Sequence, residues 1–168
     1  MPLVVMGVSG SGKSTIGAAI ARRVDALFLD ADDFHPASNI EKMASGMPLT
    51  DEDRHPWLIA VGDEIARRTA QGHEVVMACS ALKRSYRDLL RGRAEDLFFA
   101  QLDGSPELLA SRIGHRTDHF MPSALLDSQL ATLEPLAADE RGVVVDIGDA
   151  PETVVDAVVA GWPRHPAA

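Results

Sequence analysis

The chain has little cysteine, little basic charge and no long apolar run. Cys79 is the single cysteine in 168 residues, so no disulfide can form within the chain, which fits a reducing compartment. The formal net charge of −9 argues against a nucleic-acid surface, where a basic stripe is expected. No apolar run approaches the ~20 residues of a membrane span, and no basic leader precedes the short apolar start. We therefore expect a cytoplasmic protein with no signal peptide, membrane contact or nucleic-acid partner.

The most informative feature that is present is a glycine-rich loop at residues 7–14, Gly-Val-Ser-Gly-Ser-Gly-Lys-Ser. It matches the phosphate-loop pattern G-x-x-x-x-G-K-[ST] at every fixed position. An apolar run at 3–6 predicts a buried strand before it, and residues 14–23 predict a helix after it. Backbone N–H groups and a helix N-terminus then surround an anion. The predicted nucleotide-binding residues are Gly7, Ser9, Gly10, Ser11, Gly12, Lys13, Ser14 and Thr15.

Strand-like and helical stretches alternate along the rest of the chain. Further strand-like runs lie at 26–29, 74–79, 97–102 and 143–147. Three helix starts have recognisable signals: Thr50 with Asp53 as a capping box, Ser105 before Pro106, and Pro151. Alternation of this kind predicts a single α/β domain with a five-stranded parallel sheet covered by helices on both faces.

A phosphate loop alone does not separate kinases from GTPases or ATPase motors. The N/T-K-x-D segment of guanine specificity is absent, and no apolar strand ends in Asp-Glu as motors require. Instead the second strand runs into Asp30-Ala31-Asp32-Asp33, opposite the phosphate loop if the strand ends align. Carboxylates there can hold Mg²⁺ or accept a proton from a hydroxyl. The alternative is a solvated acidic turn.

Basic side chains follow at two predicted helix starts, around Arg54 and around Lys83, Arg84 and Arg87. Arginine binds a substrate carboxylate through its planar fork, although surface ion pairs would use the same residues. His35, before Pro36, can hydrogen-bond a sugar-like hydroxyl or be purely structural.

Arg112 and Arg116 lie four residues apart, on one face of a predicted helix. They are placed to act as a mobile lid, at about residues 112–122, that brings cations to a transferring phosphoryl group. The alternative is a charged helix end that faces the helix dipole.

Longer motifs resemble one family closely. They are Gly7–Ser14, the Leu29-Asp30-x-Asp32 corner with His35-Pro36, the segment from Asn39 to Leu58, the segment from Cys79 to Arg91, Arg112 with His119-Phe120, and Ser128-Gln129-x-x-x-Leu133-Glu134. This set resembles the phosphate-loop gluconokinases over residues 4–145. Ala31 and Asp118 depart from the family pattern, which usually has glycine at both positions.

The resemblance implies a nucleoside-monophosphate-kinase-like P-loop fold and the reaction of ATP with D-gluconate to form ADP and 6-phosphogluconate. It implies Mg²⁺ held by Ser14 and Asp30, and Asp32 orienting or deprotonating the substrate 6-hydroxyl. Gluconate contacts are expected from Asp32, His35, Arg54, Lys83 and Arg87. Catalytic contacts are expected from Lys13, Asp32, Arg112 and Arg116, and Pro151 is expected near the adenine.

The family also tends toward homodimers. The same loop, acidic corner and arginine clusters suit a shikimate or adenylylsulfate type of kinase as an alternative. An ATP-binding switch without phosphotransfer is a second alternative, from a different class.

Overall fold

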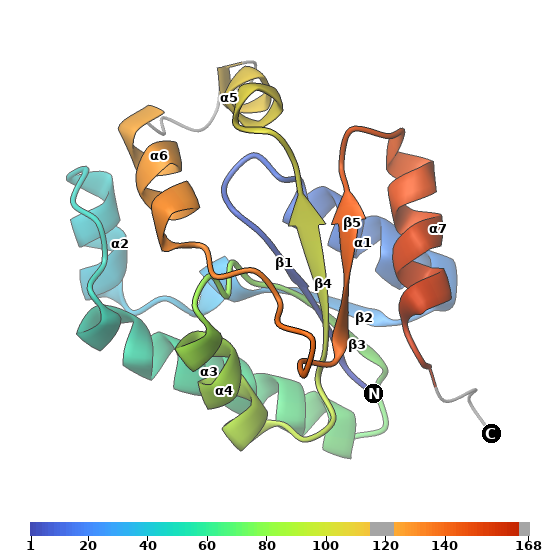
Figure 1. Cartoon of the computed structure of the whole chain (residues 1–168). Coiled ribbons are helices and arrows are strands. Elements are labelled where there is room, and N and C mark those ends of the chain that lie inside the picture. Colours follow the sequence, from blue (N-terminus) through green and yellow to red (C-terminus); the bar gives the residue numbers. More distant parts are fainter. Residues whose placement is uncertain (115–122, 165–168) are drawn as a thin grey trace.

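The computed structural model describes residues 1–114 and 123–164 of the chain, with five parallel strands at its centre (Figure 1). The strands are β1 (Leu3–Met6), β2 (Leu27–Asp30), β3 (Val75–Ala78), β4 (Phe98–Asp103) and β5 (Gly142–Asp146). Their order across the sheet is β2-β3-β1-β4-β5. The five predicted strands and the parallel sheet are therefore confirmed.

Seven α-helices and one 3₁₀ turn are described: α1 (Lys13–Val24), η1 (Ala31–Phe34), α2 (Ala37–Ala44), α3 (Asp51–Ala70), α4 (Arg84–Arg93), α5 (Pro106–Gly114), α6 (Ser123–Thr132) and α7 (Pro151–Gly161). The capping box at Thr50 and Asp53 is present, Ser105 Oγ accepts from the Leu108 N–H, and Pro151 opens α7. The sequence analysis did not predict η1, α2 or α6. None of the described helices has the length and apolar character needed to cross a membrane.

Two apolar cores cover the two faces of the sheet. Along β1 the side chains alternate, so that Leu3 and Val5 enter one core while Val4 and Met6 enter the other. The first core is closed by α1 and α7, and the second by α3 and α4, as Figure 1 shows. All four of these β1 side chains are completely buried. The predicted three-layer α/β/α architecture is confirmed.

The strand order places β1 between β3 and β4, where the chain changes its direction of travel across the sheet. From β1 the chain runs outward to β2 and back to β3, and only then crosses to β4. The crevice beyond the C-terminal end of such a strand is the usual ligand position in open α/β sheets. The glycine-rich loop starts at this point.

Candidate active site

The phosphate loop joins the end of β1 to the first turn of α1. Gly12, the residue before α1, has φ 87°, and Gly10 has φ 80°, values that glycine adopts without strain. A Cβ on Gly10 would also lie 2.8 Å from Ile113 Cγ1, so α5 supports the loop from behind. Lys13 begins α1, and its Nζ donates to the carbonyl of Val8 at 3.3 Å. The first five of the eight predicted residues lie in this connection, and Lys13, Ser14 and Thr15 lie in the first turn of α1.

The two predicted metal ligands lie together. Ser14 Oγ donates to Asp30 Oδ2 at 2.6 Å, which joins the first turn of α1 to the end of β2. Hydroxyl and carboxylate oxygens are hard ligands of the kind that Mg²⁺ prefers. In the described part of the chain, no group of three or more His, Cys, Asp or Glu side chains could hold a metal ion by itself. A cation here would therefore depend on phosphate and water oxygens for its remaining ligands.

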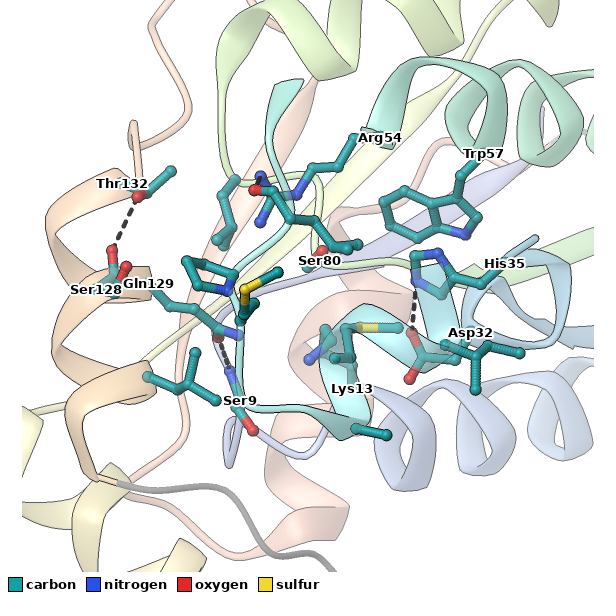
Figure 2. Close-up of a pocket in the computed structure, with 18 residues that line it drawn as sticks. Ser9, Lys13, Asp32, His35, Arg54, Trp57, Ser80, Ser128, Gln129 and Thr132 are labelled. Atoms are coloured by element: carbon teal, nitrogen blue, oxygen red, sulfur yellow. Dashed lines mark hydrogen bonds and ion pairs between the residues drawn. The ribbon is translucent and has the colours of Figure 1, made fainter. Parts of the chain in front are cut away.

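A cavity of about 450 Å³ opens beside the phosphate loop (Figure 2). This volume is within the usual range for small-molecule sites. Three of its walls come from the phosphate loop, from η1 with α3, and from α6. The lining residues are Ser9, Lys13, Asp32, His35, Ile40, Met43, Ala44, Met47, Pro48, Leu49, Arg54, Trp57, Ser80, Leu82, Leu125, Ser128, Gln129 and Thr132.

Asp32 and His35 face each other at the edge of this cavity (Figure 2). The Asp32 carboxylate is 85% exposed, and its Oδ1 lies 3.9 Å from Nε2 of His35, whose side chain is only 5% exposed. The imidazole stacks on Trp57 with a centroid distance of 4.2 Å. Burial lowers the pKa of His35, and Arg54 lowers it further while Asp32 opposes the shift. The shift favours the neutral imidazole at neutral pH.

Arg54 lies in the first turns of α3 and lines the cavity. Its Nη1 donates to the carbonyl of Leu49 at 2.5 Å and to the Tyr86 hydroxyl at 3.4 Å. The guanidinium carbon lies 5.7 Å from the centre of the Tyr86 ring. These contacts orient a planar cation that lines the cavity, as a carboxylate-binding residue requires.

The structure corrects the prediction for Arg87. This side chain is completely buried and pairs with Glu140 through two bonds of 2.7 Å. Its remaining N–H groups donate to backbone carbonyls, including those of Ala81 and Glu134. Because every donor already has an acceptor, Arg87 is a structural residue and has no donor left for a substrate.

Lys83 also lies outside the cavity lining. Its Nζ donates to both oxygens of Asp51, at 3.0 and 3.1 Å. Asp51 in turn accepts from the Tyr86 hydroxyl. Lys83 therefore braces the Tyr86 ring that lies against Arg54, and the structure does not support a direct substrate contact for it.

The lid prediction falls largely outside the described residues. Arg116, Asp118 and the rest of 115–122 are not described, whereas Arg112 lies on α5 and its Nη2 donates to the carbonyl of Ile147 at 2.7 Å. Arg112 does not line the cavity. Pro151 opens α7 and also lies outside the lining.

Sequence reasoning missed the wall that α6 provides. The Ser9 N–H donates to Gln129 Oε1 at 2.6 Å, a bond that ties this helix to the phosphate loop (Figure 2). Leu125, Ser128, Gln129 and Thr132 all line the cavity. Their i, i+3, i+4, i+7 spacing is the signal that could have identified one helical face.

The loop between β3 and α4 contributes a second wall that was not predicted. Ser80 and Leu82 line the cavity, and Ala81 between them has φ 44°. A left-handed alanine is strained and persists only where its surroundings hold it. Here the buried Arg87 donates to the Ala81 carbonyl at 3.1 Å, which stabilises the turn that presents Ser80.

A family model described as an AAA domain matches residues 3–136. A gluconokinase of Gluconobacter oxydans (strain 621H) is 46% identical, covering 94% of this chain and 88% of that protein. The thermoresistant gluconokinase of Escherichia coli (strain K12) is 45% identical, with 93% and 90% covered. The chain belongs to the gluconokinase family.

A solved structure agrees with this assignment. The crystal structure of a gluconokinase from Sinorhizobium meliloti 1021 has a TM-score of 0.87 and 51% sequence identity, and it covers 95% of this chain and 90% of that one. An adenylylsulfate kinase of Mycobacterium tuberculosis and a shikimate kinase of Aquifex aeolicus share the fold at TM-scores of 0.68 and 0.58, but at only 18% and 16% identity. The gluconokinase assignment confirms the resemblance found from the sequence motifs.

Proposed function

We propose that this chain transfers the γ-phosphoryl group of ATP to the 6-hydroxyl of D-gluconate, which yields ADP and 6-phosphogluconate. The observation that carries the proposal is one cavity lined by Lys13, Asp32 and Arg54. These residues supply a cation for the transferring phosphoryl group, an acceptor for the hydroxyl proton and a cation for the carboxylate of the acceptor.

At the donor end, Lys13 and the loop amides hold the β- and γ-phosphates. The Ser14 hydroxyl, with Asp30 behind it at 2.6 Å, would hold Mg²⁺. The ion would neutralise charge on the β- and γ-phosphate oxygens. Arg112 and Arg116 remain predictions as residues that close over the γ-phosphate, and Pro151 remains a prediction for the adenine.

At the acceptor end, Arg54 binds the gluconate carboxylate and His35 binds a hydroxyl. The 6-oxygen attacks the γ-phosphorus, the bond from phosphorus to the bridging oxygen of ADP breaks, and Asp32 takes the hydroxyl proton. A loose phosphoryl-transfer transition state demands more positioning than basicity. Asp32 therefore acts first by orienting the hydroxyl in line with the phosphoryl group.

The acceptor itself provides the test. ADP release is measured with gluconate, glucose, shikimate and adenylylsulfate, each at several concentrations with Mg²⁺ and ATP. We expect gluconate to exceed glucose by at least about a hundredfold in kcat/KM, because a site built for a charged group leaves Arg54 unpaired without it. Equal values would mean that Arg54 does not bind a carboxylate. ATP binding without stimulation by any acceptor would support a nucleotide-dependent switch instead.

We also propose that the chain forms a homodimer in the cytoplasm and has no nucleic-acid partner. The resemblance to the family supports the homodimer, and the net charge of −9 supports the absence of a nucleic-acid partner.

A further inference from the structure

Asn39 lies behind the cavity and does not line it. Its side chain comes from α2 and the residue is only 3% exposed. The amide Nδ2 donates to the backbone carbonyl of Asp53 at 2.9 Å and lies 3.4 Å from Nδ1 of His35. A buried polar side chain that joins two segments of a site in this way has a defined hydrogen-bonding role.

The hydrogen-bond partners of Asn39 determine the orientation of its amide and the tautomer of His35. A backbone carbonyl only accepts hydrogen bonds, so the atom of Asn39 beside Asp53 must be the amide nitrogen. The second N–H of that nitrogen is then the group that faces Nδ1 of His35. Nδ1 must therefore carry a lone pair, and the proton of a neutral imidazole must lie on Nε2.

Nε2 is the ring atom that faces Asp32, which also lines the cavity. It lies 3.9 Å from Asp32 Oδ1, which is too far for a direct hydrogen bond. A hydroxyl oxygen placed at about 2.8 Å from each atom would bridge them. It would accept from Nε2–H and donate its own proton to the carboxylate, so that the two groups recognise a single hydroxyl.

We propose that Asn39 is a positioning residue that holds His35 as its Nε2–H tautomer, so that His35 and Asp32 bind one hydroxyl of the acceptor as donor and acceptor. The part of this proposal that concerns acceptor binding rests on the proposed gluconate kinase activity. The lowered pKa of His35 agrees with it, because a protonated imidazole would direct an N–H from Nδ1 at the Asn39 amide. The charged groups that face the ring are Asp32 and Arg54, and Trp57 covers its stacked face.

The structural alternative is that Asn39 only attaches α2 to α3. A second contact makes the same attachment and provides a matched control. Lys42 Nζ, also from α2, pairs with Asp53 Oδ2 at 2.6 Å, and Lys42 is not among the residues that line the cavity. Lys42→Met weakens the attachment of α2 and leaves the His35 hydrogen bond intact.

The experiment measures ¹⁵N chemical shifts of the histidine rings in the full-length protein without substrate, near pH 7.5. His35→Gln identifies the His35 signals among those of the six histidines. We expect wild-type His35 to have an unprotonated Nδ1 and a protonated Nε2. Asn39→Leu should give a mixture of tautomers, whereas Lys42→Met should match the wild type. A wild-type His35 with its proton on Nδ1 overturns the proposal even if the Asn39 variant fails to fold.

Kinetics give the second readout. Asn39→Leu should lower kcat/KM for gluconate about tenfold, the equivalent of one hydrogen bond to the substrate, and leave the KM for ATP unchanged. In a His35→Gln background the same change should alter kcat/KM less than about twofold, because glutamine has no imidazole tautomer for Asn39 to hold. An equal loss in both backgrounds, or an equal loss in Lys42→Met, means that Asn39 acts only by attaching α2. Absence of gluconate phosphorylation by the wild type refutes the proposed function, and the ¹⁵N shifts still decide the tautomer.

Discussion

The acidic corner after β2 places three carboxylates within four residues, and each has a different environment. Asp30 pairs with the Ser14 hydroxyl and also accepts from the Asp32 N–H at 3.0 Å. Asp32 turns into the cavity, whereas Asp33 is exposed and does not line it. Asp32 and Asp33 both lie in the 3₁₀ turn η1, which Asp30 caps. Their roles therefore differ although their chemistry is the same.

Asparagine substitutions at these two neighbours test this difference. Asp32→Asn keeps the side-chain shape and removes the proton acceptor, so kcat should fall by about a hundredfold, within the usual range for a positioned acid or base. The KM for ATP should change little, the pattern of an interaction made mainly in the transition state. Asp33→Asn is the matched control and should stay within about twofold of the wild type. Steady-state kinetics decide the assignment, which is wrong if Asp33→Asn is the more damaging change.

At the scale of elements, the cavity is held between segments that come from distant parts of the chain. Helices α6 and α2 both contribute lining residues, and α6 contacts the phosphate loop through the bond from Ser9 N–H to Gln129 Oε1. On the α2 side, Ile40, Met43 and Met47 are large apolar residues that line the cavity while exposed. The position of α6 therefore decides how closely the acceptor is enclosed next to the phosphate loop.

Gln129→Leu should release α6 from the phosphate loop. The variant keeps the size of the side chain but removes the acceptor of the Ser9 N–H. We expect hydrogen exchange at the Ser9 amide to accelerate at least tenfold and kcat/KM for gluconate to fall about tenfold. Thr132→Val is the control for the exchange measurement, since Thr132 Oγ1 donates to the carbonyl of Ser128 within the helix. Unchanged exchange at Ser9 would show that Gln129 does not restrain the loop.

At the scale of the whole molecule, one buried ion cluster joins α4 to the segment between α6 and β5. Glu140, whose side chain is 1% exposed, accepts from Arg87 and from Arg91. Arg87 also donates to the carbonyls of Leu82 and Glu134. The cluster therefore positions the loop that presents Ser80 and the end of the segment that carries α6.

Loss of the Glu140 charge should strongly lower the free energy of unfolding. Glu140→Gln leaves the buried Arg87 guanidinium without its counter-charge, and breaking a buried pair in this way costs about 3–5 kcal/mol of unfolding free energy. The adjacent Asp139→Asn removes a solvent-exposed pair with Arg84, and an exposed pair contributes much less to stability than a buried one. Urea unfolding of both variants measures the difference. Similar losses would mean that the buried cluster is not a principal source of stability.

Acid should destabilise the protein through the same cluster. The Arg87 guanidinium is the main cause that lowers the pKa of Glu140 from 4.5 to about 2. A carboxyl whose pKa is depressed in the folded state contributes stability that is complete above its unfolded pKa and is lost as pH falls through the folded value. The unfolding free energy should therefore decline between about pH 5 and 2, and more steeply in the wild type than in Glu140→Gln. Parallel pH profiles for the two proteins would exclude Glu140 as the source.

The sequence by itself determined the features whose causes are local. The phosphate loop, the acidic corner, the capping box at Thr50 and the five strands each depend on residues adjacent in the chain, through backbone conformation, capping or apolar periodicity. The longer motifs between Asn39 and Arg91 identified the family for the same reason, because a contiguous pattern can be recognised without the fold.

Only the tertiary structure decided which polar side chains reach the cavity. Arg54 and Arg87 look alike in sequence, but one lines the cavity and the other is buried against Glu140, 53 residues away. The Gln129 contact with Ser9 spans 120 residues, and no local pattern encodes such a separation. Burial and pairing are properties of the folded surroundings, so a charged residue in a motif becomes a ligand or a structural ion pair according to what packs around it.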